Sequence, residues 1–422
     1  MSGHTFISAL LLVSLIGSLE NVYGQKERAE PGDALNAATP VLPVPSGPFG
    51  IGRIGYEWID PSRPDTYSAD PNAHRDVMVY LWYPAPRTYI GRTGPYLPGA
   101  KRMDLNPEVQ HRVGDAFGSS WPLIVSGAVV SHAVDNAPLA QSPKTFPVVL
   151  FSHGLGSIGF AYTSLIEDLV SHGYVVASIE HTYTAMAVAF PNGKVVPFHR
   201  EPEPVGLTPE QRFQRMEASA GLVITEGAGD LVFVLSKLTE MNGRKAHRFP
   251  LDGRLDLERV AAMGHSSGGA FATLACQMDR RFKACVSLDG AMPPVAVFPE
   301  YGEGFTQPVL LLEIDHSGQR RGYTAAQEVD YMKKKEAQLN ACRIGSYDIL
   351  LKSAGLNHGS FSDVPLLFAN GNKAQTADAL YNLRSTQAFT RSFLDKYLQH
   401  DIGGLLKDPS QYPGTIVTRC GR

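Results

Sequence analysis

One serine in the sequence lies at the centre of a motif that predicts a nucleophile. Residues 264–268 read GHSSG, so Ser266 has a glycine two positions away on either side. A nucleophile on a tight turn between a strand and a helix has a strained backbone, and small neighbours let the two elements approach. Residues 260–263 are apolar and residues 270–275 are small, as such a strand and helix require. We therefore expect Ser266 to be the nucleophile, since the motif spacing selects it over Ser267.

A serine hydroxyl is a weak nucleophile, so it needs a base, and the base needs an acid that orients it. In chains with this turn the three groups occur in the order serine, acid, histidine. His358 lies in a polar, glycine-containing loop before the final predicted helix, which makes it the candidate base. Asp289 and Asp315 each follow a predicted strand, at the carboxyl edge where sites in open α/β sheets form. Position alone does not separate these two acids.

Acyl transfer also needs backbone N–H groups aimed at the negative oxygen of the tetrahedral intermediate. One is expected from Ser267, the residue after the nucleophile. The other is expected from a glycine-containing turn after an earlier strand, and residues 152–156 (SHGLG) fit, with Leu155 as the donor. The 13 histidines are scattered, and no Cys-x-x-Cys or His-x-x-x-His spacing occurs. We therefore expect an oxyanion hole made by Leu155 and Ser267, and neither a metal nor another cofactor.

Strands and helices that would position these residues alternate along the chain. Residues 146–151, 162–171 and 174–179 predict a strand, a helix and a strand, which is one crossover unit of a parallel sheet. Short continuous apolar runs are typical of strands buried on both faces. Further strands are predicted at residues 75–84, 260–263, 284–288, 308–314 and 347–351, and a final helix at residues 376–398. The pattern predicts an α/β-hydrolase fold, with a mostly parallel central sheet, flanking helices and insertions.

Two segments depart from this alternation. Residues 182–205 are rich in proline and irregular, which predicts an excursion away from the sheet. Thr208, Pro209 and Gln211 predict a capped helix start, and apolar residues then recur every three or four positions up to Leu238. We interpret this long amphipathic helix as a core helix rather than a membrane element.

The composition limits the classes of function. The chain has 422 residues, of which 43% are hydrophobic, and a net charge of −3, so it can bury a large core and offers no basic surface for nucleic acid. Residues 6–19 are apolar but short for a membrane span, which predicts a signal peptide at residues 1–24 and a secreted or periplasmic location. A flexible linker is expected at residues 25–46 and one catalytic domain at residues 47–422.

The four cysteines fit an exported protein only loosely. Cys276 and Cys285 flank the helix and strand after the nucleophile, and we interpret them as small buried hydrophobic residues. Whether Cys342 and Cys420 form a disulfide is left open by the sequence.

The chain resembles the plasma-type platelet-activating factor acetylhydrolases, also called lipoprotein-associated phospholipases. The likeness covers nearly the whole mature chain in order, and it is carried by residues 47–52 (GPFGIG), 81–84 (LWYP), 151–156 (FSHGLG), 171–173 (SHG), 180–181 (EH), 264–269 (GHSSGG), 288–289 (LD) and 413–415 (PGT). The combination of FSHGLG with GHSxGG is far more specific than either motif alone.

This resemblance implies roles for particular residues. The family acid lies in a Leu-Asp pair about two dozen residues after the nucleophile; Asp289 follows Ser266 by 23 residues, so the resemblance selects it over Asp315. The family base lies in a Gly-x-x-His loop, which matches His358. The oxyanion donors match Leu155 and Ser267, although the family often has an aromatic residue at the latter position, so the pocket wall is altered here.

The resemblance also implies a substrate class, phospholipids with a short or oxidised acyl chain at the sn-2 position. It further implies that the protein reaches them by peripheral contact with a lipid surface. The segment at residues 182–205 and the histidine loop diverge from the family, so the acyl-chain preference does not carry over. A general short-chain carboxylesterase, an acyltransferase of the same fold and an inactive binding module remain as alternatives. The oligomeric state is left open by the sequence.

Overall fold

The computed structural model describes residues 39–199, 206–243, 249–290, 305–315, 345–352, 355–369, 371–401 and 404–420, together with the single residues 329 and 333. The predicted signal peptide at residues 1–24 lies outside this part of the chain, as does Cys342. Of the linker predicted at residues 25–46, only residues 39–46 are described, and they form no helix or strand.

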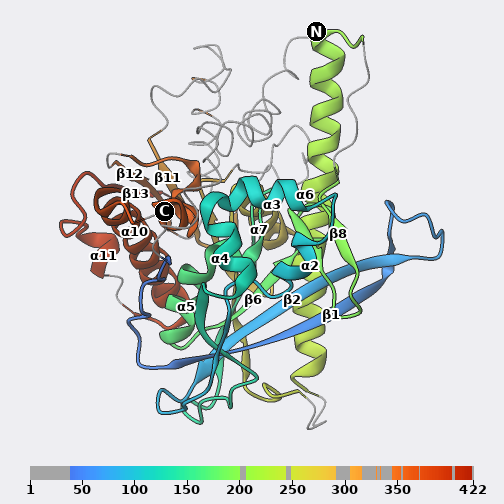
Figure 1. Cartoon of the computed structure of the whole chain (residues 1–422). Helices are drawn as coiled ribbons and strands as arrows, with labels where there is room; N and C mark the ends of the chain where they lie inside the picture. Colours follow the sequence, from blue (N-terminus) through green and yellow to red (C-terminus); the bar gives the residue numbers. More distant parts are fainter. Residues whose placement is uncertain are drawn as a thin grey trace.

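A central sheet organises the described residues (Figure 1). Neighbouring strands in its middle run parallel, in the order β6 (Val175–Glu180), β5 (Phe146–Ser152), β9 (Leu255–His265), β10 (Phe282–Leu288), β11 (Val309–Ile314) and β12 (Ser346–Leu351). Each of these strands matches a predicted one, so the mostly parallel α/β architecture is confirmed. Their carboxyl ends meet at one edge, which is where the candidate catalytic residues lie.

Strands of other orientation widen the sheet on both sides. β2 (His74–Ala85) pairs antiparallel with β6, β1 (Gly50–Pro64) pairs antiparallel with β2, and β13 (Ile416–Cys420) pairs antiparallel with β12. β4 (Val130–Asp135) runs parallel to β1, and β3 (Thr93–Pro95) lies at the outer edge. A separate hairpin, β7 (Ala187–Ala189) and β8 (Val195–Pro197), occupies the segment predicted to leave the sheet, and this prediction is confirmed for residues 182–199.

The two faces of the sheet carry two hydrophobic cores. Along β5, Val149 and Phe151 belong to the first core, whereas Val148 and Leu150 belong to the second. Helices α5 (Thr163–Ser171) and α10 (Lys373–Leu398) supply the first core, and α6 (Pro209–Met241) and α7 (Ser267–Met278) supply the second. Since adjacent strand residues point to opposite faces, a continuous apolar run is what a sheet covered on both sides requires.

Helix α6 begins as the sequence predicts. The Thr208 side chain accepts a hydrogen bond from the Gln211 N–H, and the Gln211 side chain accepts one from the Thr208 N–H. Figure 1 shows this long helix extending past the sheet at its N-terminal end. By length and composition the interval Ala218–Met241 would suffice to cross a membrane, but half of its most apolar window is buried inside the protein. Ile224 and Leu231 lie fully within the second core, which confirms the core-packing interpretation for this part of the helix.

Several elements were not predicted. These are β1, β3, β4, β13, the strands of the β7–β8 hairpin, and the short helices α2 (Ala100–Asp104), α3 (Gln110–Phe117), α4 (Trp121–Ser126), α9 (Val364–Phe368) and α11 (Gly404–Lys407). The interpretation of Cys276 and Cys285 as unpaired hydrophobic residues was wrong, because the structure joins them in a disulfide. One lies at the end of α7 and the other in β10, so two elements adjacent in space bring them together.

Candidate active site

The turn between β9 and α7 has the geometry that the sequence motif predicts. Ser266 has a positive φ of 58° with ψ of −125°, a conformation that side-chain-bearing residues rarely adopt. A Cβ atom on Gly264 would collide with the carbonyl group of Gly268, so the strand and helix could not approach this closely with larger residues. Ser266 therefore lies at the carboxyl end of β9, directly before the first turn of α7.

The structure brings His358 to one of the two candidate acids. His358 Nδ1 lies 2.6 Å from Asp289 Oδ2. Asp289 follows β10 and is buried, with a positive φ of 45°, and its backbone N–H donates to Leu312 O. Asp315 lies elsewhere, with its carboxylate 3.5 Å from Lys352 Nζ. His358 thus has a buried carboxylate that can fix its ring and stabilise a positive charge on it.

His265, the residue before the nucleophile, connects the serine turn to the His358 loop. Its Nε2 lies 2.9 Å from the His358 carbonyl oxygen, and its Nδ1 lies 2.7 Å from the Tyr162 hydroxyl. Burial and the neighbouring His358 lower the pKa of His265 to about 3, so its ring is neutral at working pH. These partners assign a tautomer in which Nε2–H donates to His358 and Nδ1 accepts from Tyr162.

The ring of His358 therefore lies against the residue next to Ser266. The centroids of the His265 and His358 rings are 4.5 Å apart. Among the described residues, no hydrogen bond joins Ser266 Oγ to His358 in this structure. Such contacts are often long in free enzymes and shorten when substrate binds.

The predicted oxyanion turn also lies beside the nucleophile. A Cβ atom on Gly154 would be 3.1 Å from Ser266 Cβ. The Leu155 N–H, however, already has an acceptor: it donates to Ser267 Oγ over 2.6 Å. The structure therefore places both predicted donors, Leu155 and Ser267, side by side, with the Ser267 side chain in contact with the Leu155 amide.

His153 holds this turn from behind. Its Nδ1 lies 2.7 Å from Gly154 O, and its Nε2 accepts a hydrogen bond from the His181 N–H. Burial, followed by the charge of His181, lowers the pKa of His153 to about 3. The Gly154 carbonyl and the Leu155 N–H belong to one planar peptide group and point in opposite directions. By binding the carbonyl, His153 fixes the direction in which the Leu155 N–H points.

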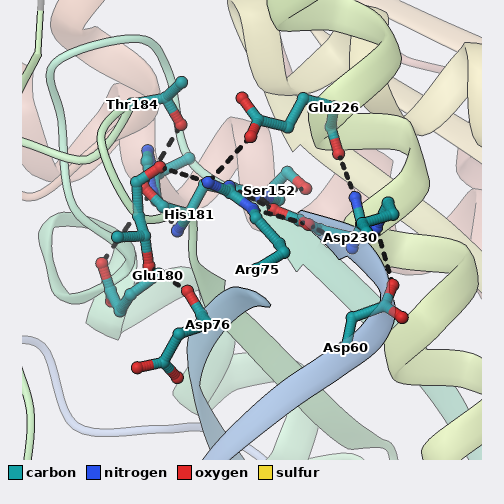
Figure 2. Close-up of polar contacts among 12 residues, drawn as sticks. Asp60, Arg75, Asp76, Ser152, Glu180, His181, Thr184, Glu226 and Asp230 are labelled. Carbon is teal, nitrogen blue, oxygen red and sulfur yellow. Dashed lines mark hydrogen bonds and ion pairs between the residues drawn. The ribbon is translucent and has the colours of Figure 1, made fainter. Parts of the chain in front are cut away.

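A buried polar network continues away from this turn (Figure 2). His181 Nε2 lies 2.8 Å from Ser152 Oγ, and His181 Nδ1 lies 2.8 Å from Asp230 Oδ2. Arg75 and Arg63 each approach the Asp230 carboxylate to 2.7 Å. Burial by itself would raise the pKa of Asp230, but Arg75 and His181 hold it well below its usual value.

Ser152, His181 and Asp230 have the residue types of a catalytic triad, but they serve a structural role. All three side chains are fully buried, and the Ser152 hydroxyl is hydrogen-bonded to His181 within the network. They connect the end of β5, the residue after β6, and α6 behind the oxyanion turn. Neither this network nor the position of His265 was predicted from the sequence. The one signal for the network was the Glu-His pair at residues 180–181, which belongs to the family resemblance but had been given no structural or catalytic role.

Within the described ranges, no three histidine, cysteine, aspartate or glutamate residues are clustered as they would be around a metal ion.

The chain is similar in sequence and in structure to several known proteins. The sequence model of the family "Platelet-activating factor acetylhydrolase, isoform II" matches residues 39–210 and 239–402. The platelet-activating factor acetylhydrolase of Cavia porcellus is 28% identical over 235 residues, which are 52% of this chain and 51% of that protein. That of Bos taurus is 30% identical over 252 residues, 54% of this chain and 49% of that protein. The chain thus spans about half the length of these relatives.

Two further matches cover more of the chain. A probable 1-alkyl-2-acetylglycerophosphocholine esterase of Arthroderma benhamiae is 24% identical over 407 residues, covering 89% of this chain and 93% of that protein. The solved structure of a ferulic acid esterase from Streptomyces cinnamoneus is 27% identical, with a TM-score of 0.67, and covers 90% of this chain and all of that one. The fold class predicted from the sequence is confirmed by this likeness.

Proposed function

Because the chain belongs to the platelet-activating factor acetylhydrolase, isoform II, family, we propose that it hydrolyses the sn-2 ester of phospholipids with short or oxidised acyl chains. The observation that carries the proposal is the His358–Asp289 pair beside the strained Ser266 turn. An esterase of this kind needs this combination of a nucleophile, a base and an acid that orients the base. The family match and the esterase relatives favour the same chemistry.

In the proposed acylation step, Ser266 Oγ attacks the carbonyl carbon while its proton moves to His358 Nε2. The carbonyl π electrons move to oxygen, and the Ser267 N–H and the Leu155 turn stabilise the resulting oxyanion. Asp289 stabilises the positive charge that develops on His358. The intermediate then collapses, the bond to the lysophospholipid oxygen breaks, and His358 gives its proton to that oxygen.

Water completes the cycle. His358 takes a proton from water, the hydroxide adds to the acyl carbon, and a second tetrahedral intermediate forms in the same oxyanion hole. When it collapses, the bond to Ser266 Oγ breaks and the serine regains its proton from His358. The products are a lysophospholipid and a short carboxylic acid.

A general short-chain carboxylesterase is the second candidate, and the likeness to the ferulic acid esterase favours it. The two functions differ in their dependence on the phospholipid headgroup and on the acyl chain. We would compare phosphatidylcholines that carry acetyl, glutaryl or palmitoyl at sn-2 with p-nitrophenyl acetate and p-nitrophenyl palmitate. Preference for sn-2 acetyl or glutaryl phospholipid supports the lipid activity, whereas turnover of p-nitrophenyl acetate alone supports the general esterase.

Substitution of the nucleophile and of the two acids tests the assignment of residues. Ser266→Ala should reduce kcat by several orders of magnitude. Asp289→Asn should reduce it by about 10³–10⁴-fold, because the amide no longer holds the correct tautomer of His358. Asp315→Asn is the matched control and should leave kcat close to the wild-type value. A loss in Asp315→Asn with none in Asp289→Asn would refute the choice of acid.

We propose that residues 1–24 direct export and that residues 47–422 form one catalytic domain, since the family match runs from residue 39 to residue 402 with one interruption. N-terminal sequencing of the secreted protein should find Gln25 as the first residue. A chain that retains Met1 would contradict the export proposal.

A further inference from the structure

The Ser267 side chain contacts the predicted oxyanion turn. Ser267 is the first residue of α7, follows the nucleophile and is almost fully buried, at 1% exposure. Its Oγ accepts the Leu155 N–H over 2.6 Å, which is the amide that should bind the oxyanion directly. A backbone N–H that donates to this hydroxyl is not free to donate to the substrate at the same time.

The hydroxyl proton of Ser267 is the second observation. Within the part of the chain that the structure describes, Ser267 Oγ donates a hydrogen bond to no protein group. A hydroxyl that accepts one hydrogen bond becomes a stronger donor, because the two bonds polarise each other. The N-terminus of α7 adds partial positive charge at the same point. The hydroxyl is thus polarised for donation to an anion and has no protein acceptor.

We propose that the Ser267 hydroxyl is a catalytic oxyanion ligand, through which the Leu155 N–H acts on the substrate. The proposal rests on the esterase function proposed above and specifies how its oxyanion hole is built. The oxyanion receives one hydrogen bond from the Ser267 N–H and a second from Ser267 Oγ–H, which in turn accepts from Leu155. One residue thereby supplies both a backbone and a side-chain donor.

This arrangement does not change which bonds form, which break, or where the Ser266 proton goes. The bond from Ser266 Oγ to the carbonyl carbon forms, the π pair moves to the carbonyl oxygen, and the Ser266 proton moves to His358. The Ser267 proton stays on its own oxygen and only shifts its direction toward the oxyanion. The opposing model is that Ser267 blocks the hole and must rotate away before Leu155 can bind the oxyanion.

Substitutions at Ser267 separate the two models. Ser267→Ala keeps the backbone N–H and frees the Leu155 N–H, so the blocking model predicts an unchanged or higher kcat. Our proposal predicts a loss of kcat on the order of 100-fold, the usual effect of deleting one oxyanion donor. Ser267→Thr keeps a hydroxyl at the same carbon and should restore most of the rate. Thr273→Val removes another buried hydroxyl of α7, which bonds only within that helix, and should change little.

An oxyanion analogue distinguishes catalysis from folding. A short-chain trifluoromethyl ketone adds to the nucleophilic serine and leaves an anionic oxygen in the hole. Its inhibition constant should rise in Ser267→Ala by the same factor by which kcat/KM falls, with the melting temperature near that of Thr273→Val. A rate loss without weaker inhibition, or no rate loss, would refute the role of Ser267. A wild-type chain that hydrolyses no ester would instead refute the proposed function itself.

Discussion

At the scale of single residues, the site depends on neutral histidines that hold other groups in place. His265 binds the backbone of His358 on one side and the Tyr162 hydroxyl on the other. His153 binds the carbonyl of Gly154. Burial lowers the pKa of both rings to about 3, so neither gains a charge over the range in which the base must be neutral. Their hydrogen bonds should therefore persist at every pH at which the enzyme works.

His153 gives a direct test of this positioning role. His153→Leu removes the donor to Gly154 O and should lower kcat about 10-fold or more with little change in KM, because the loss concerns the transition state. His153→Asn can place its amide N–H near the position of Nδ1 and should recover part of that rate. Steady-state kinetics on p-nitrophenyl acetate measures both. If His153→Leu and His153→Asn lost kcat to the same extent and were destabilised to the same extent, His153 would have a packing role only.

At the scale of elements, the buried network fixes α6 and β2 to the sheet behind the oxyanion turn. Asp230 on α6 accepts hydrogen bonds from Arg75 on β2 and contacts His181 after β6. Both Arg75 and Asp230 are nearly free of solvent contact. Removing one charge of such a group leaves the other buried without compensation, which costs more than the pair contributes.

Asp230→Asn should therefore lower the free energy of unfolding by about 3–5 kcal/mol. Urea denaturation followed by circular dichroism measures this change. Glu240→Gln removes one end of the exposed Lys237–Glu240 pair and is the control, with an expected change within about 1 kcal/mol. An Asp230→Asn variant as stable as this control would show that the network adds no net stability.

The sequence allowed the parallel strands to be predicted and the candidate catalytic residues to be proposed, because each depends on a local signal. β5, β10 and residues 260–263 of β9 are short, mostly apolar runs, and Ser266 lies in a turn whose neighbours must be small. β1 was not predicted, since its residues show neither clear alternation nor a continuous apolar run. The helices between residues 100 and 126 are too short for helical periodicity to appear.

Contacts between distant residues could not be predicted in the same way. The pairing of Cys276 with Cys285 depends on how α7 packs beside β10, and both residues also suit an apolar core. The bond from Leu155 to Ser267 depends on the orientation of one hydroxyl. The choice between Asp289 and Asp315 needed the resemblance to a family, because both follow parallel strands at the same edge.

At the scale of the whole molecule, one buried carboxyl should make stability depend on pH. Glu180 is fully shielded from solvent at the end of β6, accepts hydrogen bonds from the Gly159 N–H, and burial raises its pKa to about 8. The folded state therefore binds a proton that the unfolded state releases above pH about 4.5. Its contribution to stability is complete below that pH and is lost as the pH rises through about 8.

Glu180→Gln removes this dependence while keeping an oxygen that accepts from Gly159. The free energy of unfolding of the wild type should fall by about 3–4 kcal/mol more than that of the variant between pH 5 and pH 8. Thermal unfolding at several pH values measures the difference. Asp363, whose pKa burial raises to about 7, contributes a similar slope in both proteins and cancels in the comparison. Parallel curves for the two proteins would contradict the assignment to Glu180.

Strand β5 contributes alternate residues to both hydrophobic cores and ends at the turn that carries Leu155. This arrangement decides which residues should be randomised in a mutant library that selects for activity on bulkier esters. A change on either side of β5 would be transmitted to the turn and would reduce the rate for every substrate alike. The hairpin of β7 and β8 forms a separate two-stranded sheet, so codons randomised there leave the residues of β5 unchanged.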